Sequence, residues 1–474
     1  MALVVPGVEI RVIKELVPRR AGATGILGIV GHTEIDRSAE PLQGFASLQA
    51  FAEHFGAGTL TAMPEVPLAF QNGVREVICA GLPKGQGRPA VAAMQVRAAD
   101  GTGSEAVVQA RCNGPAGNRI GLAIAVRGNG GAPIIDVQTL LDGEPAEPPL
   151  RNLSADRHEP AFFAYAVNRS SRLLYFPGLP EPGSMYPPVG STLTPVVDSD
   201  GSRRLVLNGG TEAAIDAFGA GLARLETQPG IDLVTVSQRA PDARIATAIY
   251  SRVISHCEHM SAIARNRIGF GEIPAHGRNR PNMAAVAEMA GTLVSDRFVL
   301  VAPHGYLGAV AGRVAALDYF ESPTFKSLRG VVELSFDFSD PDLEKLLQAG
   351  VMPVDRVPRR GIAMVRGITT DNDQVSVRRI ADRAVRHVQN IAQDFIGRLN
   401  TQAQRLALKQ LLISAMDNMA QLGALVPMGD TPPYQVDVES SPSDFSQGVV
   451  RVHIAVRPVR AIDYISATVL VQAT

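Results

Sequence analysis

Continuous apolar runs alternate with amphipathic segments over much of the chain, which is typical of a parallel sheet covered by helices. Buried strands are expected at residues 25–33 and 75–82, and Ser47 and Gly56 cap the helix expected between them. After residue 211 the alternation resumes with the apolar runs DLVTVSQ, RIGFGEIP and RFVLVAP, separated by helical patterns. The pattern predicts one α/β domain, assembled from residues 21–88 and 206–350.

The hydrophobic pattern of the sequence changes between those two segments. Over residues 89–205 the apolar runs are short and are broken by Gly, Pro, Asn and Ser, without a long helical period. Strands joined by tight turns produce this pattern. It therefore predicts a β-rich domain inserted into the α/β domain.

The last hundred residues combine helical and strand patterns. An amphipathic helix is expected over residues 375–399, and a second helix around 406–422. Strand-like runs follow at 434–438, 449–456 and 463–472. The apolar stripe of the first helix consists of Val377, Ile380, Ala384, Val388, Ile391, Phe395 and Leu399. Together with the Pro- and Arg-rich stretch 351–370, these elements predict a C-terminal α+β domain over 351–474.

Both ends of the chain have extended, alternating patterns. Residues 4–13 form a short alternating strand within an N-terminal arm of residues 1–20, and the last strand lies at the opposite end. An unpaired strand edge is a template for another chain. We therefore expect an α+β, multidomain subunit whose terminal arms exchange strands with neighbouring subunits. The apolar positions expected in that exchange are Val4, Val8, Ile10, Val12, Ile465, Ala467, Val469 and Val471.

Composition narrows the possible classes of protein. A chain of 474 residues is too long for one ordinary core, and 46% hydrophobic with 19% charged residues indicates a globular protein rather than a disordered one. The net charge of -1 gives no general attraction for nucleic acid. The N-terminus lacks a signal-peptide pattern, and no apolar run approaches the length of a membrane span. We therefore expect assembly in the cytoplasm, with no nucleic-acid partner and no direct membrane insertion.

Arginine residues cluster on the helix expected at 375–399. Arg379, Arg383 and Arg386 fall opposite the apolar stripe, and Arg378 lies at the margin of that group. Such a cluster is either a solvated helix face or a contact with an acidic partner. Spacing alone does not choose between the two.

Enzymatic chemistry has weaker support. The glycines of GATGILGIVG do not follow a phosphate-binding pattern, and G-x-S-x-G is absent. His256 and His259 share a helix face but lack a third metal ligand nearby, so we expect Cys257 to be buried and both histidines near the helix surface. His304 follows a strand, where α/β enzymes place catalytic residues, but a helix needs capping and turn residues at the same position, and this explanation is strongly favoured. An α/β enzyme using His304 or a His256/His259 site is the rival hypothesis; no catalytic residue, cofactor or metal is assigned.

Several segments, in order along nearly the whole chain, resemble the contractile tail sheath family of phage tails, R-type pyocins and related injection systems. The strongest resemblance is IAVRPVRAIDYI at residues 454–465, which is similar to the family pattern I-x-V-x-P-V-x-P-A-E-F-I. It departs from that pattern at Ala461, where Pro is usual, and at Asp463 and Tyr464. Further similarities are PGVEI (6–10), FASLQAFAEHFG (45–56), GPAGNRIGLAI (114–124), HCEHMSAIA (256–264) and the stretch 302–331.

The resemblance implies a structural subunit rather than an enzyme. Sheath subunits form hexameric rings, stacked as a helical tube around an inner tube, and their contraction drives that tube through a target envelope. The implied partners are further copies of this chain, the inner tube protein, and baseplate and terminal cap proteins. The C-terminal domain would face the inner tube through Arg378, Arg379, Arg383 and Arg386. The implied location is a phage tail or a phage-tail-like particle, assembled in the cytoplasm and in some systems released.

Overall fold

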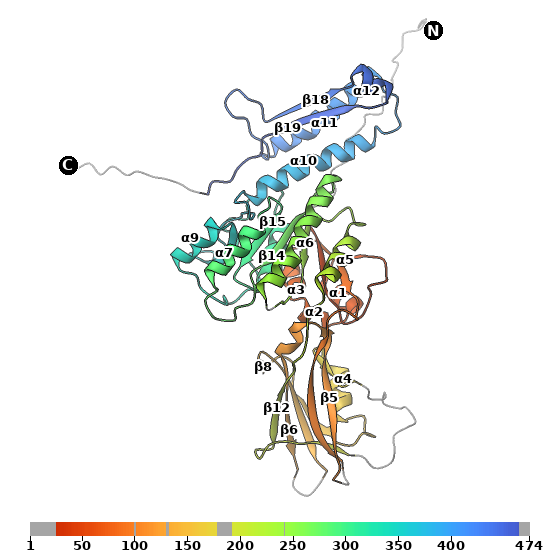
Figure 1. The fold of residues 1–474 in the computed structure, drawn as a ribbon, viewed down its shortest axis with the longest axis vertical. Helices are drawn as coiled ribbons and strands as arrows, with labels where there is room; N and C mark the ends of the chain where they lie inside the picture. The colour runs from red at the N-terminus through yellow and green to blue at the C-terminus, as the bar shows by residue number, and fades with distance from the viewer. Residues whose placement is uncertain (1–24, 99–100, 129–131, 178–191, 241, 464–474) are drawn as a thin grey trace, which may run out of the picture. The chain divides into compact units, whose positions relative to one another are not determined.

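The computed structural model describes residues 25–98, 101–128, 132–177, 192–240 and 242–463 (Figure 1). The strands expected at 4–13 and 463–472 therefore lie outside the described residues, except for Asp463, which is not in a strand. The described chain divides into two compact units. One contains residues 25–378 with 460–463, and the other contains residues 379–459.

The first unit is built on an eight-stranded mixed sheet. Parallel pairing joins six consecutive strands, from β16 to β3, while β17 and β2 pair antiparallel at the two edges. In order across the sheet the strands are β17 (Gly361–Met364), β16 (Val351–Val357), β15 (Phe298–Ala302), β14 (Ile268–Glu272), β13 (Leu233–Val236), β1 (Ile26–His32), β3 (Glu76–Leu82) and β2 (Gly44–Phe45). Nearly every residue of β1, β3, β13 and β15 is buried, which explains their continuous apolar runs.

Helices cover both faces of this sheet and form a separate core on each. The first core includes side chains of α1 (Leu48–Phe55), α3 (Glu65–Gln71) and α8 (Leu307–Ala316); the short α2 (Thr59–Ala62) lies between α1 and α3. The second core includes side chains of α5 (Ile215–Leu225), α6 (Ala243–Ala262), α7 (Met283–Thr292) and α9 (Asp340–Gln348). The α1 caps are as expected, since Ser47 accepts a hydrogen bond from the amide of Ala50 and Gly56 ends the helix with φ +90°.

Helix α8 approaches α3 closely because two of its glycines face the α3 backbone. A Cβ at Gly308 would lie 2.2 Å from the carbonyl oxygen of Glu65, and one at Gly312 would lie 2.4 Å from that of Ala69. Both distances are far below van der Waals contact. Gly308 and Gly312 are therefore explained by packing rather than by ligand binding.

The region from Pro89 to Val206 is rich in strands and has a core of its own. One antiparallel sheet contains β10 (Leu174–Tyr175), β5 (Gly103–Asn113), β4 (Pro89–Ala98) and β11 (Leu193–Pro195). The other contains β12 (Ser202–Val206), β6 (Ile120–Arg127), β7 (Ile134–Leu141), β8 (Glu144–Pro145) and β9 (Leu150–Ser154). A 3-10 turn (Pro115–Arg119) and the buried helix α4 (Phe163–Ser170), which the sequence analysis did not predict, complete this region.

Residues 351–370 were expected to begin the C-terminal domain, but they belong to the first unit. They supply β16 and β17, which extend the large sheet beside β15. Pro353 does not interrupt the pairing, since it lies opposite Ala302 of β15 in a strand whose first five residues are buried. The described C-terminal unit therefore begins at Arg379.

The C-terminal unit contains most of α10 (Val375–Gln393), then α11 (Gln402–Gln421), β18 (Tyr434–Glu439), α12 (Pro442–Ser446) and β19 (Arg451–Val456). Helix α10 ends six residues before the expected position. Residues 394–398 form turns, Gly397 takes a φ of +83°, and Leu399 is 80% exposed. The end of the predicted apolar stripe thus lies on a loop. Within the described ranges, no helix is long and apolar enough to cross a membrane.

Candidate functional site

The β18–β19 hairpin is the first candidate surface. The two strands pair antiparallel from Tyr434 opposite Val456 to Glu439 opposite Arg451. Among the described residues this sheet has only these two strands, so each has an outer edge with no partner strand. A hairpin alone is marginally stable in water. Its open edges are therefore candidate sites for the addition of further strands.

The two faces of the hairpin differ in character. Val436 is buried on the inner face, where β18 packs against α11. The outer face is polar and carries charges of both signs. Asp437 lies opposite His453, and Glu439 lies opposite Arg451, whose guanidinium also binds Asp444. An added strand that matches this sheet would present apolar side chains inward and charged side chains outward.

The residues expected to supply those strands are not described. Val4, Val8, Ile10, Val12, Ile465, Ala467, Val469 and Val471 all lie outside the described residues. Their role in strand exchange stays a prediction.

The four arginines of α10 are less exposed than expected for a solvated or partner-binding face. Arg379 is only 8% exposed, and Arg378, Arg383 and Arg386 are half-buried. Arg378 donates to Asp296 at 2.7 Å. The expectation that this face lies open is therefore wrong for Arg379, while the contact with an inner tube stays a prediction.

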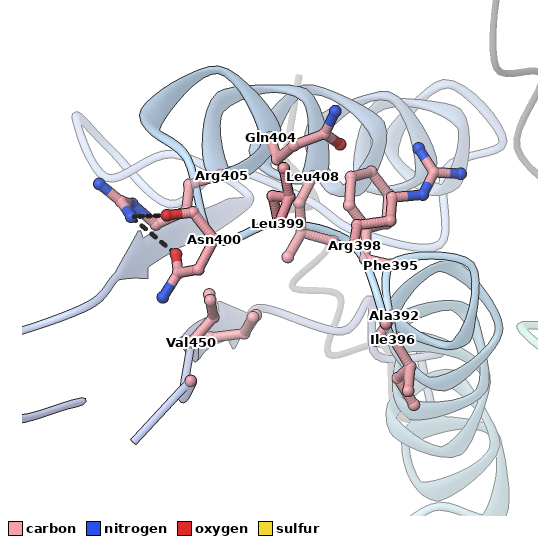
Figure 2. A pocket seen from close by; sticks show the side chains of 13 residues that line it. Ala392, Phe395, Ile396, Arg398, Leu399, Asn400, Gln404, Arg405, Leu408 and Val450 are labelled. Atoms are coloured by element: carbon pink, nitrogen blue, oxygen red, sulfur yellow. Dashed lines mark hydrogen bonds between the residues drawn. The ribbon is translucent and has the colours of Figure 1, made fainter. Parts of the chain in front are cut away.

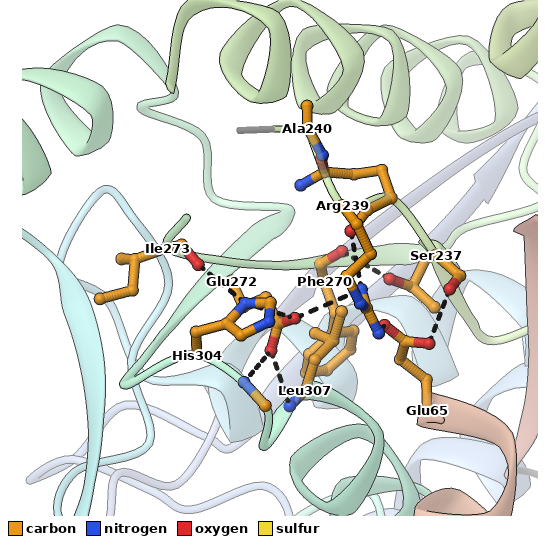
Figure 3. Close-up of polar contacts among 12 residues, drawn as sticks. Glu65, Ser237, Arg239, Ala240, Phe270, Glu272, Ile273, His304 and Leu307 are labelled. Carbon is orange, nitrogen blue, oxygen red and sulfur yellow. Dashed lines mark hydrogen bonds and ion pairs between the residues drawn. The ribbon is translucent and has the colours of Figure 1, made fainter. Parts of the chain in front are cut away.

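A buried polar cluster lies where the parallel strands end (Figure 3). Glu272, at the end of β14, is 1% exposed and accepts a hydrogen bond from the amide of Gly305 at 2.8 Å. The Nδ1 atom of His304 lies 3.0 Å from Oε1 of Glu272. Arg239, after β13, forms an ion pair with Glu65 at 2.6 Å, and its guanidinium lies 3.6 Å from Glu272. Ser237 donates to the other Glu65 oxygen at 2.7 Å.

This cluster stabilises the fold rather than exposing a reactive group. Burial favours a raised pKa for the Glu272 carboxyl, but His304 and Arg239 outweigh it and hold that pKa at about 2. Each charged side chain of the cluster therefore lies next to an opposite charge. The two partner carboxylates, Glu65 and Glu272, are only 3% and 1% exposed. The sequence analysis named His304 but missed Glu65, Arg239 and Glu272, whose proximity only the sheet topology reveals.

The two histidines of α6 have different surroundings. Cys257 is buried, as expected, and His259 is exposed, but His256 is also buried, which corrects the expectation of a surface position. The guanidinium of Arg267 lies 2.7 Å from Nε2 of His256. Burial and the Arg267 charge lower the pKa of His256 to about 3, so its ring is neutral and accepts from Arg267. Its Nε2 lone pair is thus already used, which argues against a metal site at this pair.

Among the residues that the structure describes, no three His, Cys, Asp or Glu side chains come together as metal ligands. The described residues thus contain a hairpin with open edges and a buried cluster whose charges pair with one another.

Residues 212–370 match the family model described as the phage tail sheath protein central domain. These residues include five of the eight strands of the large sheet, β13 to β17, together with Glu272 and His304. A tail sheath protein of Bacillus phage SP01 is 28% identical over 182 residues.

The matched part of the chain is similar to the phage tail sheath protein family. The SP01 match covers 32% of this chain and 30% of that relative, so less than a third of the relative's length is matched. Two solved sheath structures have the same fold over nearly the whole chain. The contracted helical sheath of the anti-feeding prophage is 15% identical and has a TM-score of 0.56. The match covers 98% of this chain and 99% of that chain. The contracted PVC sheath complex of an extracellular contractile injection system is 10% identical and has a TM-score of 0.55. This match covers 99% of this chain and 98% of that chain.

This similarity favours the structural hypothesis over the rival enzyme. Sheath proteins are structural and not enzymes, which confirms the expectation that the chain is not an enzyme. The His304 cluster and the His256/Arg267 pair are accordingly part of the sheath fold. The matched range ends at Thr370 and contains β16 and β17, consistent with their place in the large sheet.

Proposed function

We propose that the chain is the sheath subunit of a contractile phage tail or injection system. Its copies polymerise as stacked hexameric rings around an inner tube, and contraction drives that tube through a target envelope. Further partners are baseplate and terminal cap proteins, and the particle assembles in the cytoplasm. The relatives named above support this, since both similar structures come from contracted sheaths. The observation that carries the proposal is the β18–β19 hairpin, whose outer edges have no partner strand among the described residues.

The domain arrangement follows from the same proposal. The C-terminal unit faces the inner tube, and the α/β sheet with the β-rich region between Pro89 and Val206 lies further out. The terminal arms of neighbouring subunits add strands to the hairpin and link the lattice. A backbone hydrogen bond contributes about 0.5–1.5 kcal/mol net, so four or five per added strand amount to several kcal/mol before ordering costs. Such a link holds subunits together while larger polar interfaces change register.

Contraction needs no nucleotide bound to the subunit in this proposal. The energy is stored as a metastable packing of the extended lattice and is released when interfaces change. The strand links persist because they are flexible tethers rather than rigid faces. The arginines of α10 supply a weaker contact with an acidic surface of the inner tube, which is broken during contraction.

The test is deletion of each arm. Removing residues 1–13 or residues 468–474 should leave a folded, soluble protein that no longer polymerises, because the core of each unit keeps its own contacts. Circular dichroism measures folding, and negative-stain microscopy measures tube formation by the full chain and by each deletion. Tubes of normal length from both truncated chains would show that strand exchange is not the link.

A further inference from the structure

The hairpin is one of two exposed surfaces that have features of a binding site. An apolar pocket of about 310 Å³ lies beside β19, with Leu399, Leu408 and Val452 among its lining residues, and therefore belongs to the hairpin surface (Figure 2). The second surface lies in the other compact unit, where β16 and β17 join at one edge of the large sheet. It is charged rather than apolar, and the proposed function gives it no role.

Basic residues gather at this edge from the segments 326–329 and 356–360. Together the two segments carry five basic residues and no acidic one, namely Lys326, Arg329, Arg356, Arg359 and Arg360. They lie side by side because residues 325–328 pair with β17, where the amide of Leu328 donates to the carbonyl of Ile362. All four arginines are exposed. We refer to these four arginines as the arginine tip.

Two residues at this edge have a backbone conformation that costs free energy. The amide of Arg360 donates to the carbonyl of Val357 at 3.1 Å, and Arg359 in the turn between them has a φ of +65°. Glycine or asparagine normally occupies this position of such a turn. Phe325 has a φ of +56° and is 39% exposed. Larger residues held in this conformation cluster at binding and switch regions, so the strain indicates that these side chains have a task at the surface.

Arg360 fixes the shape of the arginine tip. Its guanidinium donates to the carbonyl of Phe325 at 3.0 Å, and its Cζ atom lies 5.7 Å from the centre of the Phe325 ring. The carbonyl of Arg360 accepts a hydrogen bond from the hydroxyl of Ser327 at 2.8 Å. Arg360 thus ties the turn to the neighbouring segment. The other arginines are therefore presented on an ordered backbone, and little ordering is needed when a partner binds.

The remaining arginines have donors available for a partner. The side chains of Arg329 and Arg359 have no hydrogen-bond or ion-pair partner among the residues that the structure describes. Arg356 has a distant contact, in which its Nε atom lies 3.8 Å from a carboxylate oxygen of Asp337. A guanidinium is a planar fork of N–H donors that matches the geometry of a carboxylate. The arginine tip therefore fits an acidic protein surface.

A complementary acidic segment lies on the same unit. Residues 333–344 contain five acidic residues and no basic one, namely Glu333, Asp337, Asp340, Asp342 and Glu344. Arg280 already binds Asp342, whereas Glu344 accepts a hydrogen bond from the neutral side chain of Gln348. The carboxylate of Asp340 has no side-chain partner within the described ranges. Asp340 and Glu344 are four residues apart on α9, so they lie on one face of the helix.

We propose that the arginine tip of one subunit binds the acidic segment 333–344 of a second copy of this chain, through Asp340 and Glu344 on α9. The inference rests on the proposed function and adds to it an interface that uses neither the terminal arms nor the inner tube. Within one chain, the described parts of the two surfaces meet between Arg356 and Asp337, which leaves charges on both available. Contact between two different surfaces joins subunits head to tail. Such contacts build closed rings or helical filaments, as the proposed function requires.

The charge balance of the chain favours a second copy over a nucleic acid as the partner. Its 45 Lys and Arg residues are matched by 46 Asp and Glu residues, so the positive charge of the arginine tip is balanced by acidic residues elsewhere on the chain. A nucleic-acid-binding protein carries a broader basic surface that follows the phosphate backbone. Every copy of this chain, in contrast, brings one arginine tip and one acidic segment. Each exposed ion pair is weak, but the pairs repeat at every subunit.

Charge reversal followed by mixing tests the pairing. The tip variant carries Arg329→Glu and Arg359→Glu, and the acidic-segment variant carries Asp340→Lys and Glu344→Lys. Each variant alone should fail to form tubes, because like charges meet at every interface. An equal mixture of the two should form tubes again, since Glu on one chain then meets Lys on the other. A single chain with all four changes should also form tubes. Sedimentation and negative-stain microscopy measure tube formation.

The control variant carries Arg151→Glu and Arg204→Glu at exposed positions of the β-rich region, and it should form tubes as the unmodified chain does. All variants should keep the melting temperature of the unmodified chain, because surface substitutions have small effects on stability. Tubes from the tip variant or the acidic-segment variant alone would overturn the pairing and leave the proposed function intact. Folded variants whose mixture and four-change chain form no tubes would also overturn it and would place the arginine tip on a different partner. Failure of the unmodified chain to form tubes would instead reject the proposed function.

Discussion

At the scale of single residues, the buried charges around Glu272 show how the chain stabilises the end of its sheet. The carboxylate lies 3.0 Å from His304 and accepts the amide of Gly305, while Arg239 connects it to Glu65. A pair of this kind contributes little relative to an apolar replacement, but loss of one member leaves the other charge buried and unpaired. Arg239, Glu272 and His304 lie within the range that matches the sheath central domain, and Glu65 lies before it.

Changing Glu272 to Gln should destabilise the chain by about 3 kcal/mol, since Arg239 and His304 lose their shared anion in a buried site. Urea unfolding at pH 7 measures this loss, and Glu288→Gln on the exposed face of α7 is the control, with an effect within about 0.5 kcal/mol. The pKa of Glu272 is held below its usual value, so the wild-type advantage is complete above pH 4.5 and is lost as pH falls towards 2. An advantage that grows on acidification would contradict the ion-pair explanation.

At the scale of elements, the sequence predicted those parts whose hydrophobic pattern is local. The apolar runs of β1, β3 and β15 and the caps of α1 are explained by burial and by Ser47 and Gly56. Strand β16 was missed because the stretch 351–370 is rich in Pro and Arg, although Pro353 pairs with Ala302 of β15 and Asp355 pairs with Ala363 of β17. The end of α10 was missed because Phe395 and Leu399 continue its stripe beyond the helix. The Glu272 cluster joins residues far apart in sequence, which periodicity cannot bring together.

The β-rich region should be removable without unfolding the α/β sheet. Its two connections to the sheet run side by side, since Arg88 and Thr211 exchange two backbone hydrogen bonds. A short Gly/Ser linker in place of residues 89–205 therefore joins ends that already lie close together. The deletion also removes the Glu34–Arg111 ion pair and the hydrogen bonds around it. Circular dichroism and thermal unfolding should show a cooperative α/β fold, and global unfolding would show that the region is not an independent insertion.

At the scale of the whole molecule, the two compact units and the terminal arms suit different tasks in a sheath. The first unit buries two apolar cores against one sheet and supplies a rigid body. The second unit presents a two-stranded sheet with an apolar pocket beside it, which is a surface suited to receiving strands. Weak contacts that repeat at every subunit then set the register of the lattice, while each one alone is easily broken.

We propose that the arginines of α10 make contacts of this last class. Arg379 is buried, so its replacement would test folding; Arg383 and Arg386 are half-buried and are the better probes of the inner tube. Changing both to Glu should abolish extended sheath on its tube, because like charges would meet the acidic tube surface, while the monomer still unfolds in one cooperative transition. The control reverses Lys409 and Arg457 in the same unit. Raising the salt concentration should weaken extended sheath in the same direction, since partly exposed pairs are screened. Electron microscopy of sheath assembled with its inner tube measures both effects; extended sheath from the Arg383/Arg386 variant would place the tube contact on another surface of the subunit.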